Sequence, residues 1–401
     1  MKLIDDKEWK GFLIRAYIYV VFKFSLVFAL FLPLILEKSL SPIYIFYFYI
    51  VNQITKIILE IPTGSLADRF GEKKCLIVAQ ILQMIGILIF VIKIDETTAI
   101  VVGIIFGLAD TILTGPDIVY NNLKHYGRED YFTIFNRRSN AIINFIFAAL
   151  GISTSLVLKF FGNYNTMIWT EFVIACIALI ALFGITDHKQ RNENIQKLNT
   201  NLFKIIKQAF KYTLKHRSIS YMLFRNCISY IVVTKVVGTY NSVLYKDITN
   251  NENMVGYLFF FDAMSAALFG YWMSIKDRKI STKWALLLYI ITDLLLLVAI
   301  VVYKFPFSYL LIIVFWWQGI IAYPVYYAKQ QSMIPLKIRS TVASIESFIR
   351  AIISIPVLYY FSYLSEQYSY YYGFLFVSIF GFVMLGIVTA LMLRDKHIMK
   401  N

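Results

Sequence analysis

The sequence has 401 residues, of which 59% are hydrophobic and 16% are charged, and its mean hydropathy is +0.65. This composition is far more apolar than that of a soluble globular protein, and it indicates an integral membrane protein. The sequence contains no Walker loop, HExxH, GxSxG or spaced Cys/His cluster, so ATP hydrolysis and metal or serine catalysis have no support. We therefore expect no enzyme activity, no cofactor and no metal site.

Twelve apolar segments of about 20 residues, each long enough to cross a hydrocarbon core, follow one another along the chain. The first six lie at about 11–36, 43–61, 75–92, 99–121, 138–158 and 167–185. The fourth carries small and acidic residues at helical spacing: Gly103, Gly107, Asp110, Thr114 and Asp117. A lipid-facing carboxylate is disfavoured by roughly 2.5–3.5 kcal/mol, so we expect this face to point into a helix bundle.

A polar and basic segment at 186–218 separates the first six spans from the second six. Its hydrophobic residues share one helical face, which suggests a basic amphipathic helix on the inner leaflet; a plain connector is the alternative. The second six spans lie at about 219–243, 255–274, 283–303, 307–327, 341–363 and 371–393. The sequence thus predicts an all-α membrane protein of twelve transmembrane helices in two six-helix bundles, at 1–185 and 219–401, joined by a cytoplasmic linker.

The net charge of +15 could indicate a nucleic-acid partner, but the positions of the basic residues argue for a membrane. With the N-terminus inside, 29 of the 39 Lys and Arg residues fall in cytoplasmic segments and only five fall in outer loops. The opposite orientation would invert this positive-inside pattern. We expect both termini to lie in the cytoplasm, the protein to reside in the cell membrane, and the lipid bilayer rather than nucleic acid to be its partner.

The segment 60–74, which reads EIPTGSLADRFGEKK, is a charged insert between the second and third spans. Pro62 and Gly64 are expected to end the second helix, and Gly71 to allow a sharp reversal. The segment resembles the signature loop between helices 2 and 3 of the major facilitator superfamily of secondary transporters, in the following residues: Gly64, Leu66, Ala67, Asp68, Arg69, Gly71, Lys73 and Lys74. Glu72 departs from the family pattern, which usually has a basic residue there.

The resemblance implies that two six-helix bundles rock about a substrate site near the membrane midplane. It also implies an inner gate, in which Asp68 packs at the N-terminus of helix 11 and Arg69 meets a carboxylate at the inner end of helix 4, with Asp117 as the candidate. The implied gate residues are Gly64, Asp68, Arg69, Gly71, Lys73 and Asp117. The fifth span lacks the Gly-Pro element that is typical of drug–proton antiporters.

Ionisable side chains deep in membrane spans are functional candidates by default. The candidates for substrate binding or proton coupling are Lys23, Asp110, Lys235, Asp262, Asp293, Glu346 and Arg350. Two pairs stand four residues apart, Lys56 with Glu60 and Glu346 with Arg350, so local pairing explains these charges without a substrate. A functional role is favoured for the candidates that have no partner close in sequence: Lys23, Asp110, Lys235 and Asp262.

These features together predict a secondary active transporter that works by alternating access, without enzymatic activity. We expect proton-coupled export of amphipathic small molecules or small peptides by a monomer, with Asp110 and Asp262 as proton sites and Lys23 and Lys235 as cations of comparable depth. Import of a small solute, such as an amino acid or a sugar, is the alternative within transport. A non-transporting sensor or lipid-handling protein of the same fold is the alternative outside it.

Overall fold

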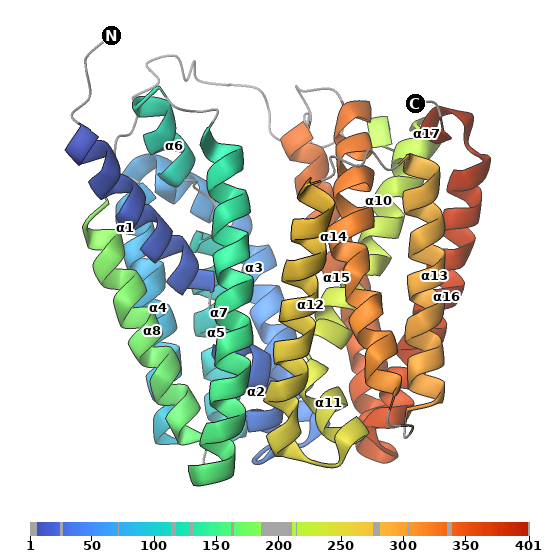
Figure 1. The fold of residues 1–401 in the computed structure, drawn as a ribbon, viewed down its shortest axis with the longest axis horizontal. Helices are drawn as coiled ribbons and strands as arrows, with labels where there is room; N and C mark the ends of the chain where they lie inside the picture. Colours follow the sequence, from blue (N-terminus) through green and yellow to red (C-terminus); the bar gives the residue numbers. More distant parts are fainter. Residues whose placement is uncertain are drawn as a thin grey trace. The chain divides into compact units, whose positions relative to one another are not determined.

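The computed structural model describes residues 6–24, 27–70, 72–113, 118–127, 131–161, 164–185, 211–213, 215–275, 281–303, 305, 307–334 and 339–399. The regular elements in these ranges are helices. The chain divides into two compact units, unit 1 of Met1–Asn194 and unit 2 of Ile195–Asn401 (Figure 1). Most of the predicted linker at 186–218 lies outside the described residues, so the predicted domain boundaries stay predictions.

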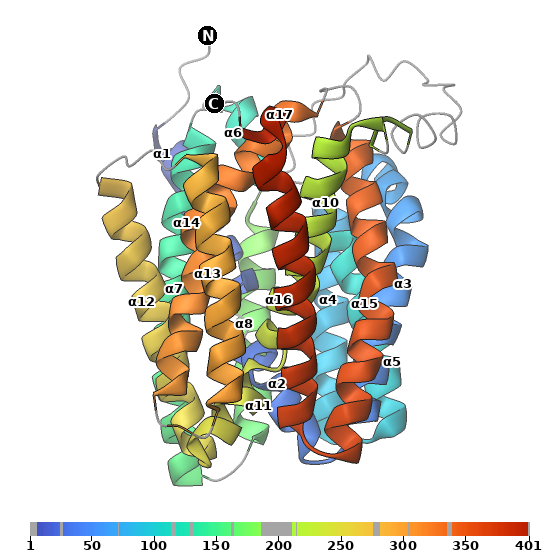
Figure 2. The ribbon, with the colours of Figure 1, turned by 90° about the vertical axis from the view of Figure 1, so that its right-hand side faces the viewer.

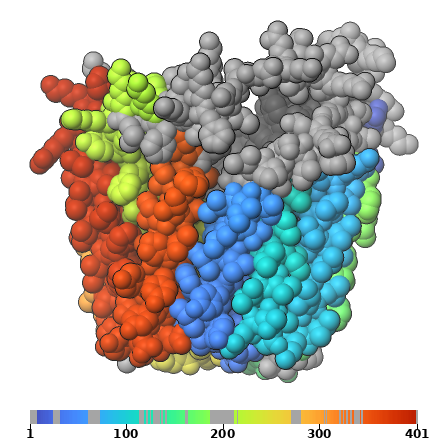
Figure 3. Space-filling model, turned by 180° about the vertical axis from the view of Figure 1, so that it is seen from behind, coloured from blue at the N-terminus to red at the C-terminus, as the bar shows by residue number. Residues whose placement is uncertain are grey.

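Unit 1 is built from antiparallel long helices and two short helical segments. Its described elements are α1 (Asp6–Phe24), α2 (Val27–Glu37), α3 (Pro42–Phe70), α4 (Glu72–Ile92), α5 (Glu96–Leu113), α6 (Ile118–His125), α7 (Tyr131–Phe161) and α8 (Asn165–Phe183). Helix α5 packs against both α3 and α4, and Figure 3 shows the blue surface of α3 beside the cyan surfaces of α4 and α5. A hydrophobic core cluster joins α1, α4, α6, α7 and α8.

Unit 2 begins with a broken helix and continues with five long ones. Its described elements are α10 (Arg217–Ser229), the π-helix η1 (Tyr230–Gly238), α11 (Asn241–Thr249), the short 3₁₀ turn η2 (Glu252–Met254), α12 (Val255–Ile275), α13 (Thr282–Val301), α14 (Ser308–Met333), α15 (Arg339–Gln367), α16 (Tyr370–Arg394) and α17 (Lys396–Met399). Helix α16 lies between α13 and α15 (Figure 2). A core cluster joins α10, α13, α14, α16 and α17.

The helices reproduce the predicted spans closely, and the fold is the twelve-helix architecture that the sequence predicts. Seven helices in the described ranges are long and apolar enough to cross a membrane unaided: α3, α4, α7, α8, α13, α15 and α16. The bent pair Arg217–Gly238 and Asn241–Thr249 would make an eighth. The remaining predicted spans correspond to α1 with α2, α5 with α6, α12, and α14.

Two details of the prediction were wrong. Helix α3 does not end at Pro62 or Gly64 but continues to Phe70, so the predicted tight loop shrinks to the position of Gly71, which is not described. Proline is tolerated inside membrane helices, because neighbouring groups satisfy the carbonyl that it leaves unbonded. The seventh span is also not one straight helix at 219–243, because it passes into a π-helix and then bends by 55° before α11.

Candidate functional site

Among the implied gate residues, Lys73 has a side chain that the structure describes. Its Nζ donates a hydrogen bond of 2.8 Å to the carbonyl oxygen of Phe183, the last residue of α8. The last carbonyls of a helix lack intrahelical partners and carry the negative end of the dipole, so a lysine there both caps and neutralises them. The side chains of Asp68 and Arg69, together with Gly64, Gly71 and Asp117, are not placed well enough to describe, and the gate formed by these residues stays a prediction.

The small-residue face of α5 packs tightly on α3, as the prediction of an inward face requires. A Cβ atom on Gly103 would lie 2.7 Å from the carbonyl oxygen of Phe48, and one on Gly107 would lie 2.7 Å from the Cβ of Thr55. Real Cβ atoms do not come this close to their neighbours. Glycine is therefore required at both positions for the two backbones to approach.

Asp110, on the next turn of α5, has a cationic partner that the sequence analysis did not assign. Its Oδ2 lies 2.6 Å from the Nζ of Lys56 on α3, and both side chains are about one-third exposed. The expectation that Lys56 pairs with Glu60 concerns a glutamate whose side chain is not described. Lys23 lies at the end of α1, where its Nζ is 5.6 Å from the centroid of the Tyr19 ring, within cation–π range.

The broken helix α10–η1–α11 organises the polar side chains of unit 2. A π-helix has a wider turn than an α-helix, and such segments often occur at functional sites. Discontinuous helices likewise form binding sites in many transporters, because their unwound backbone and redirected side chains face a cavity. Arg225 and Asn226 project from α10, Lys235 from η1, and Tyr245 from α11.

Arg225 forms a buried ion pair that the sequence analysis missed. Its Nη2 lies 3.5 Å from the Oδ2 of Asp293 on α13, its Nε donates to the hydroxyl of Thr389 at 3.0 Å, and its guanidinium lies 3.7 Å from the centre of the Tyr289 ring. The Arg225 side chain has no exposed surface, and Asp293 is 5% exposed. The contacts of Arg225 tie α10 to α13 and α16, and they give Asp293 a partner within the protein. An arginine inside the predicted seventh span was the available sequence signal.

Glu346 accepts hydrogen bonds from three elements of unit 2. The amide of Asn226 donates to Oε1 at 2.9 Å, the amide of Gln330 donates to Oε2 at 3.0 Å, and Arg350 forms the ion pair predicted from the spacing of four residues. Hydrogen bonds in which a partner is charged are stronger than neutral ones. Glu346 therefore fastens α10, α14 and α15 together.

The ring of Tyr230 lies between two cations next to this carboxylate. The guanidinium of Arg350 is 4.8 Å from the ring centroid, and the Nζ of Lys235 is 5.7 Å from it. The charge of Arg350 is balanced by Glu346. The predicted residues Lys235, Glu346 and Arg350 thus gather around one aromatic ring.

Asp262 on α12 has a tyrosine of α11 as a hydrogen-bond partner. The hydroxyl of Tyr245 donates to its Oδ2 at 3.4 Å, and across the described residues this side chain has no ion-pair partner. One turn further, Ser265 accepts a hydrogen bond from the indole of Trp317 at 3.3 Å, and Trp317 stacks on Phe269 with centroids 4.6 Å apart. An unbalanced carboxylate beside flat aromatic faces can take up a proton or attract a cationic or amphipathic molecule. The described residues show no group of His, Cys, Asp and Glu suited to a metal ion.

Comparisons with known proteins agree with this architecture. The sequence profile of the Major Facilitator Superfamily matches residues 13–358. The nucleoside transporter NupG resembles the structure with a TM-score of 0.68 and 12% identity, covering 96% of this chain and 99% of that one. A D-xylose-proton symporter gives 0.67 and 15%, covering 96% and 95%.

A bacterial homologue of the human lysosomal transporter Spinster gives a TM-score of 0.65 with 12% identity, covering 96% of both chains. A search of curated proteins returns no match. At these identities the structural neighbours establish the fold and leave the substrate open.

Proposed function

We propose that this chain, which belongs to the major facilitator superfamily of membrane transporters, exports amphipathic small molecules or small peptides in exchange for protons. Membership of the family and the shared fold support transport across a membrane. The direction, the proton and the substrate class are our inference. Two units of helices in one chain provide the two bodies that alternating access requires.

Our proposal of proton coupling is based on the contacts of Asp262. Among the described residues, Asp262 has Tyr245 as a hydrogen-bond partner and no ion-pair partner. An ionised carboxylate without a counter-charge is costly in low-dielectric surroundings, and protonation removes that cost. If transport exposes this group to the two sides of the membrane in turn, it can load a proton on one side and release it on the other. A substrate that competes for the same carboxylate would couple its own movement to that of the proton.

The two carboxylates that are predicted as proton sites, Asp110 and Asp262, have different partners. Asp110 is held by Lys56 at 2.6 Å, so its charge is balanced without any substrate, whereas Asp262 relies on one long hydrogen bond from Tyr245. We therefore assign coupling to Asp262 and a fixed charge pair to Asp110. Lys23 and Lys235 remain candidates for substrate contact rather than partners of these carboxylates.

The proposed substrate preference rests on an aromatic pair near Ser265 and Phe269, which lie one and two turns along α12 from Asp262. Trp317 and Phe269 present parallel rings that differ by only 9° in orientation, a flat surface suited to apolar or cationic groups. A site built for sugars or free amino acids would instead carry several converging polar groups. Amphipathic compounds with an amine or an aromatic ring fit these surroundings better.

The test is transport by purified protein in proteoliposomes. Compounds that raise the melting temperature of the protein would be selected first, because ligands stabilise the folded state by mass action. We expect a pH gradient to drive accumulation in the wild type, and Asp262→Asn to abolish that accumulation while exchange without a gradient continues. Asp95→Asn, which removes a carboxylate outside the membrane-spanning helices, is the matched control.

Three other outcomes would decide against the proposal. Full gradient-driven accumulation by Asp262→Asn would remove this residue as the coupling site. Accumulation in the opposite direction, with sugars or amino acids as ligands, would identify an importer. A folded protein that binds ligands or lipids but moves none of them would identify a sensor or lipid-handling protein.

A further inference from the structure

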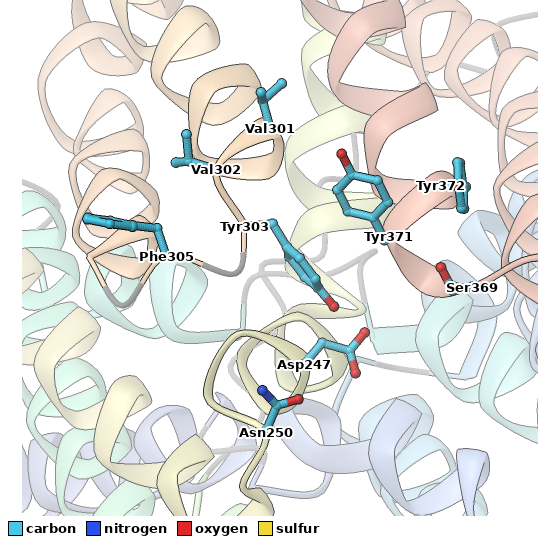
Figure 4. A pocket seen from close by; sticks show the side chains of 9 residues that line it. All are labelled: Asp247, Asn250, Val301, Val302, Tyr303, Phe305, Ser369, Tyr371 and Tyr372. Carbon is cyan, nitrogen blue, oxygen red and sulfur yellow. The ribbon is translucent and has the colours of Figure 1, made fainter.

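A cavity lies in unit 2 where α11 and α13 end and α16 begins, and neither Asp262 nor Glu346 is among the residues that line it (Figure 4). Its volume is about 950 Å³, which is ample for a small organic molecule. It is lined by Asp247, Asn250, Val301, Val302, Tyr303, Phe305, Ser369, Tyr371 and Tyr372. None of these residues is among the candidates predicted from the sequence, and the proposed transport cycle does not use them.

The lining combines aromatic rings with one carboxylate. The rings of Tyr303 and Tyr371 have their centroids 5.2 Å apart, and those of Tyr371 and Tyr372 are 5.3 Å apart. Asp247 is the charged member of the lining set. In Figure 4 the hydroxyl of Tyr303 lies beside the carboxylate of Asp247.

Aromatic residues at a membrane interface usually need no ligand to explain them, because they anchor the protein among the lipid headgroups. Tyr303 differs from such anchors, since only 8% of its surface is exposed and its side chain points into the cavity. An anchoring belt also gives no reason for a carboxylate among the rings. Tyr303, Tyr371 and Asp247 together therefore form a concave, acidic and aromatic surface.

The turn that ends α11 at Asn250 borders the cavity. Asn250 adopts the left-handed conformation with φ of 51° and ends α11, and the next residue, Asn251, caps η2 by accepting a hydrogen bond of 2.9 Å from the backbone N–H of Asn253. The neighbouring Lys246 lies 4.0 Å from Glu252, the first residue of η2, and this contact joins α11 to the turn. The turn fixes the position of Asp247 on the last turns of α11.

We propose that this cavity binds an organic ammonium ion, with Asp247 as its counter-ion and the faces of Tyr303 and Tyr371 around its alkyl groups. An ammonium group is attracted both by a carboxylate and by the negative face of an aromatic ring, and no neutral or anionic ligand uses both. Asp262 does not line this cavity but is linked to it through α11, which carries both Asp247 and the Tyr245 that bonds to Asp262. The proposal does not depend on the direction of transport.

The experiment measures choline binding to the full-length protein in detergent by calorimetry, with its uncharged isostere 3,3-dimethylbutan-1-ol as the comparison ligand. We expect choline to bind and the alcohol not to bind. We expect Asp247→Asn to weaken choline binding by about tenfold or more, and Tyr303→Leu to weaken it by about three- to tenfold, as the loss of a counter-ion or a cation–π face implies. Melting temperatures of both variants without ligand establish that they are folded.

Glu366→Gln is the matched control, because this glutamate lies on α15 and is not part of the lining. Equal binding of choline and the alcohol, or unchanged choline binding in both folded variants, would overturn the proposal. Loss of choline binding in Asp262→Asn but not in Asp247→Asn would place the ligand at the transport site and would also overturn it. That result would leave the proposed transport function intact.

Discussion

Arg225 and Asp293 form an ion pair inside unit 2 from which water is excluded. Removing one partner of such a pair leaves a buried charge uncompensated, whereas removing both leaves none. We predict that Arg225→Met lowers the free energy of unfolding by about 3–5 kcal/mol. Arg225→Met combined with Asp293→Leu should recover most of this loss. Denaturant titration in detergent micelles measures both effects.

The control for this prediction is Arg15→Met, because Arg15 lies at an exposed position on α1 and bonds only across one helical turn to Gly11. It should change the free energy of unfolding little. A double variant as damaged as Arg225→Met alone would mean that Arg225 stabilises the unit through its contacts with Tyr289 and Thr389 rather than through Asp293.

Asp95 lies in the loop that leads into α5, outside the membrane-spanning helices. Its carboxylate accepts a hydrogen bond from Lys93, with Nζ and Oδ2 2.7 Å apart, and another from the backbone N–H of Thr98 at 2.8 Å. These bonds lower the pKa of Asp95 from 3.8 to about 2, and the bond from Lys93 has the largest effect. Since the folded state has the lower pKa, the stabilisation is complete above about pH 4 and is lost as the pH falls toward 2.

We predict that Asp95→Asn lowers the melting temperature at neutral pH and that the difference from the wild type shrinks between pH 4 and pH 2. Asparagine keeps an acceptor for the N–H of Thr98 but lacks the charge, so Asp95→Ala should cost more than Asp95→Asn at neutral pH. A difference between Asp95→Asn and the wild type that stays constant down to pH 2 would show that the ionised carboxylate contributes nothing.

How far the site could be predicted depended on where each partner lies in the chain. Glu346 and Arg350 stand one helical turn apart, so their pairing follows from helix geometry alone. Lys56 with Asp110 requires knowing which face of α3 meets α5, a tertiary contact that periodicity does not give. Arg225 was overlooked for the related reason that its partner Asp293 lies on a different helix.

At the scale of helices, the contact between α3 and α5 depends on glycine. A methyl group on Gly107 would lie 2.7 Å from Thr55 and 2.8 Å from the carbonyl oxygen of Asn52, and neither backbone can yield without separating the helices. We predict that Gly107→Ala lowers the free energy of unfolding by about 1–3 kcal/mol, the range for overpacked cores. Because Asp110 lies one turn away, the distance to Lys56 should increase as well.

Gly319→Ala is the matched control, since a Cβ atom on this glycine of α14 would meet nothing within 4 Å. Thermal unfolding in detergent should separate the two variants. If both alanine variants melt with the wild type, the close approach of α3 and α5 is not required for stability.

The helical spans were predictable because hydrophobic length is set by the bilayer, and the predicted bounds of α4, α8, α12, α13 and α16 differ from the structure by a few residues at most. The breaks were not predictable. Neither the π-helix of η1 nor the bend before α11 has a proline, and both depend on what the neighbouring helices of unit 2 leave room for. The proline that was expected to end α3 does not do so, because a membrane helix can continue past it.

At the scale of the whole chain, one broken segment of unit 2 carries polar side chains that meet partners on several other helices. From its start, α10 carries Arg225 and Asn226, η1 carries Lys235, and α11 carries Tyr245 and then Asp247. Closed pairs occupy the first part, where Arg225 meets Asp293 and Asn226 meets Glu346. Tyr245, which bonds to Asp262, and Asp247, which lines the aromatic cavity, both follow the π-helix. In our proposal, the closed pairs on α10 hold the start of the segment in place, and the residues on α11 respond to ligands.

The orientation of the chain in the membrane follows from its basic residues, of which 29 fall in the segments predicted to be cytoplasmic and five in outer loops. The electrical cost of moving so many cations to the outer face fixes the prediction that both termini lie inside.

We predict that a cysteine placed in the linker, as in Asn199→Cys, is labelled by a membrane-impermeant maleimide only after the cells are opened. A cysteine in the loop after α4, as in Asp95→Cys, should be labelled in intact cells. Both substitutions are made after Cys75, Cys176 and Cys227 have been replaced by serine, so that the signal reports the new position alone. Labelling of the linker from outside would reverse the topology and would move the cavity around Asp247 to the cytoplasmic face.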